Sequence, residues 1–126
     1  MKQYIIIGVA MLIILALNFW QSSYLKETSM YILADINEID NSVQREDFDA
    51  ALKGAYGLED TWKNVQNMWD IFGEHNDVER VTEHIDSIKV YAKYEDKEEL
   101  VNEYTLLEGL IKHIIDAEQV NIGNIL

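Results

Sequence analysis

The stretch "EDFDAALKGAYGLEDTWKNVQNMWDIFG" spans residues 46–73 and contains no proline. Its apolar side chains recur at alternating steps of three and four residues. This spacing places one apolar stripe on a single face of a helix, as helices in left-handed bundles require. The stripe consists of Phe48, Ala51, Ala55, Leu58, Trp62, Val65, Trp69 and Phe72. The stretch therefore predicts a long amphipathic helix that packs within a helical bundle.

The same rhythm continues before and after this stretch. Three further stripes follow steps of three and four residues, and no segment alternates with period two, so an all-α chain is predicted. Four helices joined by short turns favour an up-down-up-down antiparallel bundle. The side chains expected in the bundle core are Ile32, Ile36, Ile39, Phe48, Leu58, Trp62, Val65, Trp69, Phe72, Val81, Ile85, Ile88, Leu107, Ile111 and Ile114.

Capping residues predict where the helices begin and end. Asn76 with Glu79, and Asp96 with Glu99, each place a capping side chain three residues before a carboxylate, as in a capping box. The expected helices are 22–41, 46–73, 77–95 and 97–119, with Ser42 or Asp47 as the cap of the second and Gly73 at its end.

Gly54 lies inside the second of these helices, in the segment "ALKGAYG". An interior glycine costs a helix about 1 kcal/mol relative to alanine. Either the close approach of a neighbouring helix or a local kink would account for it, and the sequence leaves both explanations open.

The run "YIIIGVAMLIILALNFWQ", residues 4–21, precedes the amphipathic segments and contains no charged side chain. As a helix its apolar part is about 25 Å long, close to the ~30 Å hydrocarbon core of a bilayer. Its Ile, Leu, Val and Phe side chains together favour insertion by about 3–6 kcal/mol. The expected anchor residues are Tyr4, Ile5, Ile6, Ile7, Val9, Leu12, Ile13, Ile14, Leu15, Leu17, Phe19 and Trp20.

Cleavage of this run is not expected. A signal peptidase site needs small residues one and three positions before the cleavage point. In the region after the apolar run where these should lie, this chain has Asn18, Phe19 and Trp20. A buried core helix is also disfavoured, because the run is apolar on every face. We therefore predict an uncleaved transmembrane anchor over residues 1–21, rather than a cleaved signal peptide or a soluble core helix.

Charge near the N-terminus predicts the orientation of this anchor. Lys2 and the terminal amine precede the apolar run, so the positive-inside rule places the N-terminus in the cytoplasm. Residues 22–126 then form an extracytoplasmic bundle on a single-pass protein of the cell membrane. Because neither Pro nor Gly lies between Val9 and Lys53, we expect the anchor to continue unbroken into the first bundle helix.

The formal net charge of the chain is −13, and cysteine is absent. An acidic surface is repelled by nucleic-acid phosphates, so we expect no nucleic acid among the partners. The lack of cysteine excludes disulfides and thiolate metal sites.

The residue types that carry catalysis or metal binding show no recognisable spacing. His75, His84 and His113 lie in different segments, without the spacing of known metal-binding motifs. Trp62 and Trp69 share a helix face, which favours core packing over an aromatic ligand site. We therefore expect a protein that is not an enzyme and holds no cofactor or metal.

Trp62, Trp69, His75, the ending "LIKHIIDAEQVNIGNIL" and the N-terminal anchor together resemble the domain of unknown function 4363 family. The resemblance covers nearly the whole chain. It implies a short membrane-anchored protein of a Gram-positive, spore-forming bacterium, from a family without an established activity. Genes of this family tend to lie beside those of YetF-like integral membrane proteins, some of them linked to spores. The resemblance therefore implies a partner protein of that kind.

Two functions remain open at this point. The first is a non-enzymatic accessory subunit, whose anchor and bundle engage a multi-span, YetF-like membrane protein. The second is an extracytoplasmic sensor, whose bundle binds a small ligand or a cation between its helices. Four apolar side chains near the C-terminus either contact such a partner or fold back over the core: Val120, Ile122, Ile125 and Leu126.

Overall fold

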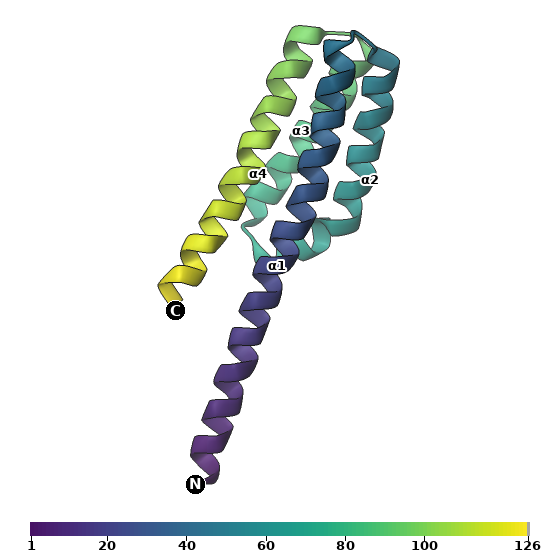
Figure 1. The fold of residues 1–126 in the computed structure, drawn as a ribbon. Coiled ribbons are helices and arrows are strands. Elements are labelled where there is room, and N and C mark those ends of the chain that lie inside the picture. The colour runs from purple at the N-terminus through teal and green to yellow at the C-terminus, as the bar shows by residue number, and fades with distance from the viewer. Residues whose placement is uncertain (126) are drawn as a thin grey trace.

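The computed structural model describes the backbone of residues 1–125 and the side chains of residues 1–118. Its helices are α1 (Lys2–Gln44), α2 (Phe48–Phe72), α3 (His75–Lys93) and α4 (Lys97–Ile125). They form an up-down-up-down bundle, and the N-terminal part of α1 projects from it (Figure 1). The predicted all-α class is confirmed, as is the continuation of the apolar run into the first bundle helix.

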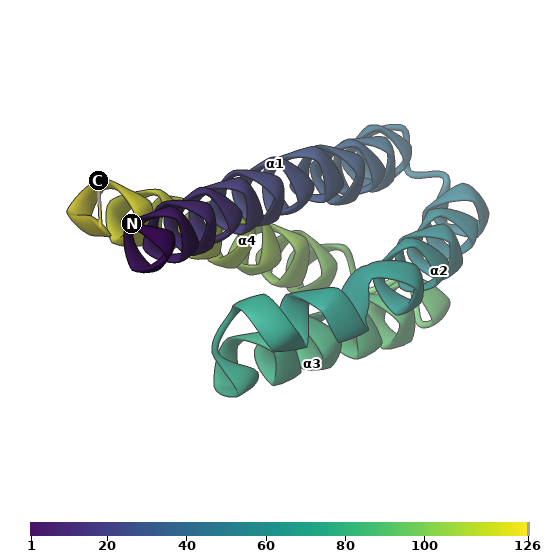
Figure 2. The ribbon, with the colours of Figure 1, turned by 90° about the horizontal axis from the view of Figure 1, so that it is seen from below.

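Each helix packs against two others, so the bundle is a ring in the order α1, α2, α3, α4. Figure 2 shows this arrangement from below, with α1 and α4 adjacent. The α1–α2 and α3–α4 turns lie at one end, which we call the distal end. The α2–α3 turn lies at the proximal end, where α1 leaves the bundle (Figure 1).

The core consists of the apolar stripes of all four helices. Every predicted core side chain is buried except Phe48 and Phe72, which are partly exposed and pack against the edge of the core. These two residues are the first and the last of α2, where the bundle ends and fewer neighbours remain to cover a large ring.

The two tryptophans in the core have hydrogen-bonded indoles. The Trp69 indole N–H donates to Thr28 Oγ1 at 2.8 Å, and the Thr28 hydroxyl in turn donates to the Tyr24 carbonyl at 2.8 Å. The Trp62 indole N–H donates to Thr82 Oγ1 at 2.9 Å. The two indole rings pack edge to face, with centroids 5.5 Å apart. Both side chains are therefore core residues with satisfied polar groups.

Both distal turns contain a glutamate in the left-handed region, Glu46 with φ 57° and Glu95 with φ 56°. In each turn the following aspartate N–H bonds back to a helix carbonyl, as in a Schellman motif. The predicted helix 77–95 is therefore too long at its C-terminus: α3 ends at Lys93, because the backbone at Glu95 is no longer helical. Glycine usually occupies this position, so the sequence contains no clear stop signal here.

Two aspartates begin the helices that follow these turns. The Ala50 N–H donates to Asp47 Oδ1 at 3.1 Å, and the Glu99 N–H donates to Asp96 Oδ1 at 3.3 Å. Of the two caps considered for α2, Asp47 is the correct one. Ser42 instead lies within α1, whose last residue is Gln44.

The cap predicted at Asn76 is wrong. The carbonyl of Glu74 accepts hydrogen bonds from the N–H groups of Asp77 and Val78, at 3.1 and 3.2 Å. α3 therefore begins at His75, two residues earlier than the capping-box pattern indicates, and Asn76 lies in its first turn. Gly73 follows the end of α2, as predicted, in an extended conformation.

Close helix packing accounts for Gly54. A Cβ built on Gly54 would lie 3.0 Å from Ile39 Cγ1 of α1, whereas a Cβ on Gly57 would meet no atom within 4 Å. The glycine at position 54 therefore lets α1 and α2 approach each other.

This difference predicts opposite outcomes for two alanine substitutions. Gly57→Ala is expected to stabilise the bundle by about 1 kcal/mol, through helix propensity alone. In Gly54→Ala the added methyl is expected to cost about 1–3 kcal/mol through overpacking against Ile39, which cancels or outweighs that gain. Chemical denaturation of both variants measures the difference, and equal stabilisation would contradict the close packing.

Candidate functional site

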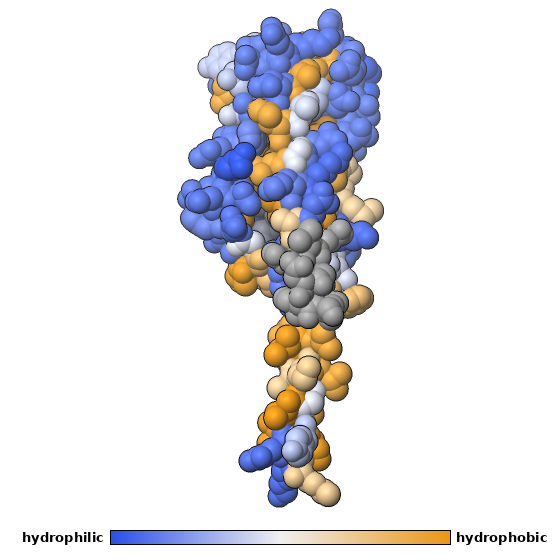
Figure 3. Space-filling view, turned by 90° about the vertical axis from the view of Figure 1, so that its left-hand side faces the viewer, coloured by the Kyte–Doolittle hydropathy of each residue, from blue (hydrophilic) through white to orange (hydrophobic). Residues whose placement is uncertain are grey.

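The projecting part of α1 is apolar and uncovered. Its side chains from Tyr4 to Leu17 are exposed on all sides, and Figure 3 shows them as a hydrophobic segment below a mostly hydrophilic bundle. Within the residues that the structure describes, α1 is the one helix long and apolar enough to cross a membrane, by length and composition. This arrangement is compatible with a single-pass membrane protein.

Three aromatic rings join this segment to the proximal end of the bundle. Trp20 packs edge to face on Phe72 of α2, with ring centroids 5.5 Å apart. The ring centroid of Tyr24 lies 5.9 Å from that of Trp20 and 6.1 Å from that of Phe72. We call Trp20, Tyr24 and Phe72 the junction cluster. It places the end of α2 beside the residue at which the apolar run ends.

Side-chain hydrogen bonds join α1 to α2 and to α4, from the height of the junction cluster toward the distal end. Two of them link α1 to α2 and two link it to α4, and all connect residues far apart in sequence. The pairs are Trp69–Thr28, Thr61–Asp35 at 2.6 Å, Tyr104–Asp40 at 2.6 Å and Gln21–Glu118 at 2.9 Å. Hydrogen bonds at several heights hold α1 in one rotational setting relative to the bundle. A displacement of the projecting segment is therefore coupled to α2 and α4.

Two residues in these contacts have raised pKa values, Tyr104 and Glu118. Burial and the neighbouring Asp40 carboxylate raise the pKa of the Tyr104 hydroxyl, so it stays protonated and donates. Burial also raises the pKa of Glu118, while the hydrogen bond from Gln21 acts in the opposite direction.

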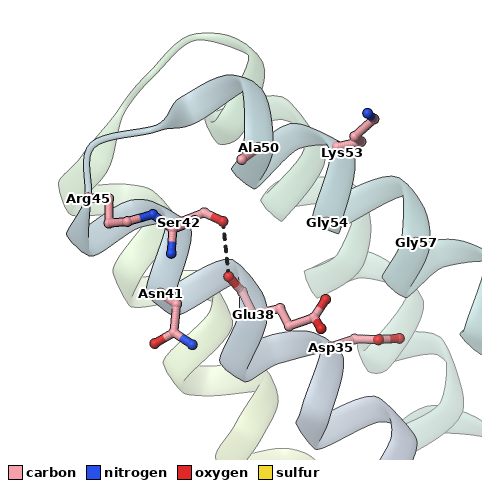
Figure 4. Close-up of a pocket in the computed structure, with 9 residues that line it drawn as sticks. All are labelled: Asp35, Glu38, Asn41, Ser42, Arg45, Ala50, Lys53, Gly54 and Gly57. Carbon is pink, nitrogen blue, oxygen red and sulfur yellow. Dashed lines mark hydrogen bonds between the residues drawn. The ribbon is translucent and has the colours of Figure 1, made fainter.

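A groove between α1 and α2 near the distal end combines acidic, basic and bare backbone surface. Asp35 and Glu38 of α1 lie on one side, and Gly54 and Gly57 of α2 leave part of the other side without side chains (Figure 4). Arg45 adds a positive charge at the end of α1. The groove has a volume of about 420 Å³, within the size range of small-molecule sites. However, Asp35 already accepts a hydrogen bond from α2, so this carboxylate serves helix packing.

His75 lies between two carboxylates at the proximal end. Its Nδ1 is 2.8 Å from Asp70 Oδ1, and its Nε2 is 3.1 Å from Glu79 Oε1. The hydrogen bond and charge of Asp70, followed by the charge of Glu79, raise the pKa of the imidazole. With both ring nitrogens facing carboxylates, this histidine suits an imidazolium and not a metal ligand, which needs a free nitrogen.

Two further charged pairs bridge neighbouring helices. His84 Nδ1 donates to Glu103 Oε2 at 2.7 Å between α3 and α4. Lys89 of α3 donates to Glu59 of α2, and this hydrogen bond lowers the pKa of Glu59 and raises that of Lys89. Among the described side chains no group of three or more His, Asp or Glu could hold a metal ion. The ionisable groups of these two pairs join helices to one another.

The family model described as Domain of unknown function (DUF4363) matches residues 19–125. The chain belongs to this family. No curated protein and no solved structure is detectably similar to the chain. The DUF4363 match begins next to Trp20, so it covers the junction cluster and the whole bundle but leaves out most of the projecting apolar segment.

In this DUF4363 protein the predicted site residues fall into three groups. The predicted anchor residues form the exposed segment of α1, and the predicted core residues line the inside of the bundle. The predicted partner interface, Val120, Ile122, Ile125 and Leu126, lies outside the described side chains. The sequence interpretation missed the polar contacts of α1, although three of the residues involved, Gln21, Thr28 and Asp35, recur every seven positions along one helix.

Proposed function

We propose that this DUF4363 protein is a non-enzymatic, bitopic accessory subunit of a multi-span membrane protein of the YetF-like kind, with a role in the spore. The proposal places residues 1–21 in the membrane with the N-terminus in the cytoplasm, and the bundle outside. One observation carries it: α1 is a single helix that joins an uncovered apolar segment to a bundle, and both neighbouring helices hydrogen-bond to it.

The polar contacts of α1 support a subunit in which a movement of the membrane segment also moves the bundle. A flexible tether would anchor a domain equally well, but hydrogen bonds at four heights along α1 give the segment a defined direction. A fixed direction matters where an anchor must pack beside the transmembrane helices of a partner, since that packing depends on close side-chain fit.

The decisive experiment isolates the full chain from its native membranes in a mild detergent and identifies the proteins that accompany it. We expect one multi-span membrane protein in a fixed ratio. A matched variant replaces residues 4–17 by a Leu/Ala helix of equal length, which keeps the anchor but removes its specific surface. Loss of the partner in this variant would assign recognition to the membrane segment. Recovery of the native chain alone would contradict the proposal.

The groove between α1 and α2 favours a second candidate function, a sensor that binds a small ligand or a cation. Its lining combines two carboxylates with the cationic side chains of Arg45 and Lys53, so a zwitterionic molecule would suit it better than a bare cation. A chain that purifies without a protein partner, but whose melting temperature rises with such a molecule, would support the sensor instead.

A further inference from the structure

We propose that the α2–α3 turn rests on the membrane surface, with the side chain of Ile71 inserted into the interfacial layer of the bilayer. The inference rests on the proposed membrane anchor. It gives the bundle a second contact with lipid, beside the helix that anchors it, and it makes the proximal end of the bundle a lipid-facing surface.

The junction cluster sets the height of the bilayer surface relative to the bundle. Trp20 ends the apolar run, and tryptophan concentrates at the boundary between membrane and water. Its ring lies 5.5 Å from that of Phe72, so the last turn of α2 is at the same height along α1. A bilayer that surrounds the projecting segment therefore reaches the end of α2.

Ile71 is the apolar side chain that α2 presents at this height. It is adjacent to Phe72 and 72% exposed. A single exposed isoleucine is ordinary on a protein that works in water. Here, however, Ile71 lies near the end of an exposed apolar run: Trp20 is half-exposed, and its ring packs on that of Phe72, the next residue after Ile71. The membrane that covers this run is the occupant that fits Ile71 as well.

The charges around the turn limit how deep this contact goes. Asp70, Glu74 and Asp77 surround it, and carboxylates stay in the aqueous part of the interface. They also oppose approach to anionic lipids, whereas a zwitterionic surface leaves the apolar contact of Ile71 unopposed. We therefore expect one inserted side chain, with the remainder of the turn among the headgroups.

The test uses the full chain in phosphatidylcholine nanodiscs. Because the chain contains no cysteine, single cysteines carry a nitroxide label at chosen positions without further changes. Ile71→Cys reports on the turn and Leu12→Cys on the projecting segment. Val90→Cys is the matched control, since Val90 is 49% exposed on α3 and about 22 Å farther along that helix from the turn.

Accessibility of each label to dissolved oxygen and to a water-soluble nickel chelate gives its depth. We expect the label at position 71 to lose accessibility to nickel and gain accessibility to oxygen relative to position 90, with the label at position 12 deeper still. A label at position 71 that matches position 90, while position 12 lies in lipid, overturns the inference and leaves the anchor intact. If position 12 is also in water, the anchor itself fails.

A second measurement uses the native side chain and avoids any effect of the label. Isoleucine methyl groups labelled with carbon-13 should show, for Ile71, magnetisation transfer from lipid protons in the nanodisc. Absence of this transfer, with transfer present for Ile13 in the projecting segment, overturns the inference as well.

Discussion

Replacement of Trp69 by alanine is expected to lower the free energy of unfolding of the bundle by about 3–5 kcal/mol. The side chain is 1% exposed and packs edge to face against Trp62. Its removal leaves a cavity and also deprives Thr28 of its indole donor. Thermal and chemical denaturation, followed by circular dichroism, measure the loss.

Two further variants separate the causes of this loss. Trp69→Phe keeps most of the apolar contact but removes the indole N–H, so we expect a smaller loss than with alanine. Ile71→Ala lies two residues away on the exposed surface and should change stability by no more than about 0.5 kcal/mol in detergent. An alanine variant at position 69 with unchanged stability, but with a lost ligand or partner, would instead favour an aromatic binding site.

The double substitution Leu12→Asp and Ile13→Asp is expected to remove the protein from the membrane. Each substitution replaces a side chain that favours membrane insertion by one that opposes it. The free energy of insertion therefore becomes less favourable by about 3–4 kcal/mol per position near the centre of the segment. The two together cost about 6–8 kcal/mol, more than the 3–6 kcal/mol by which the apolar run favours insertion. Both side chains are exposed and make no contribution to the bundle core.

Extraction of membranes with alkaline carbonate distinguishes integral from soluble chains and so measures this effect. The matched control is Val90→Asp with Leu106→Asp, which adds the same charge at two half-exposed positions of the bundle. We expect the control to stay in the membrane pellet and the double variant at positions 12 and 13 to enter the supernatant. A native chain that is itself extracted would refute the proposed anchor.

Much of the fold was predictable because its signals are local. The three-and-four rhythm of apolar residues identifies each helix and its buried face, since side chains at those steps share one side of a helix. The cap at Asp96, and Asp47 as one of two candidate caps, were predictable for a similar reason, because a capping side chain bonds to a backbone group only three residues away. The left-handed glutamates at positions 46 and 95 were not, because glycine is the usual residue there.

The candidate site depended on contacts between residues distant in sequence. The apolar run and its length followed from the sequence alone, because composition over one continuous segment decides whether a helix is apolar all round. The tertiary structure decided that Phe72 packs against Trp20, and that Asp40 and Gln21 bond to α4. Those pairings depend on the relative heights and rotations of whole helices, which the joint packing of side chains from several helices sets. No local pattern in one helix specifies that packing.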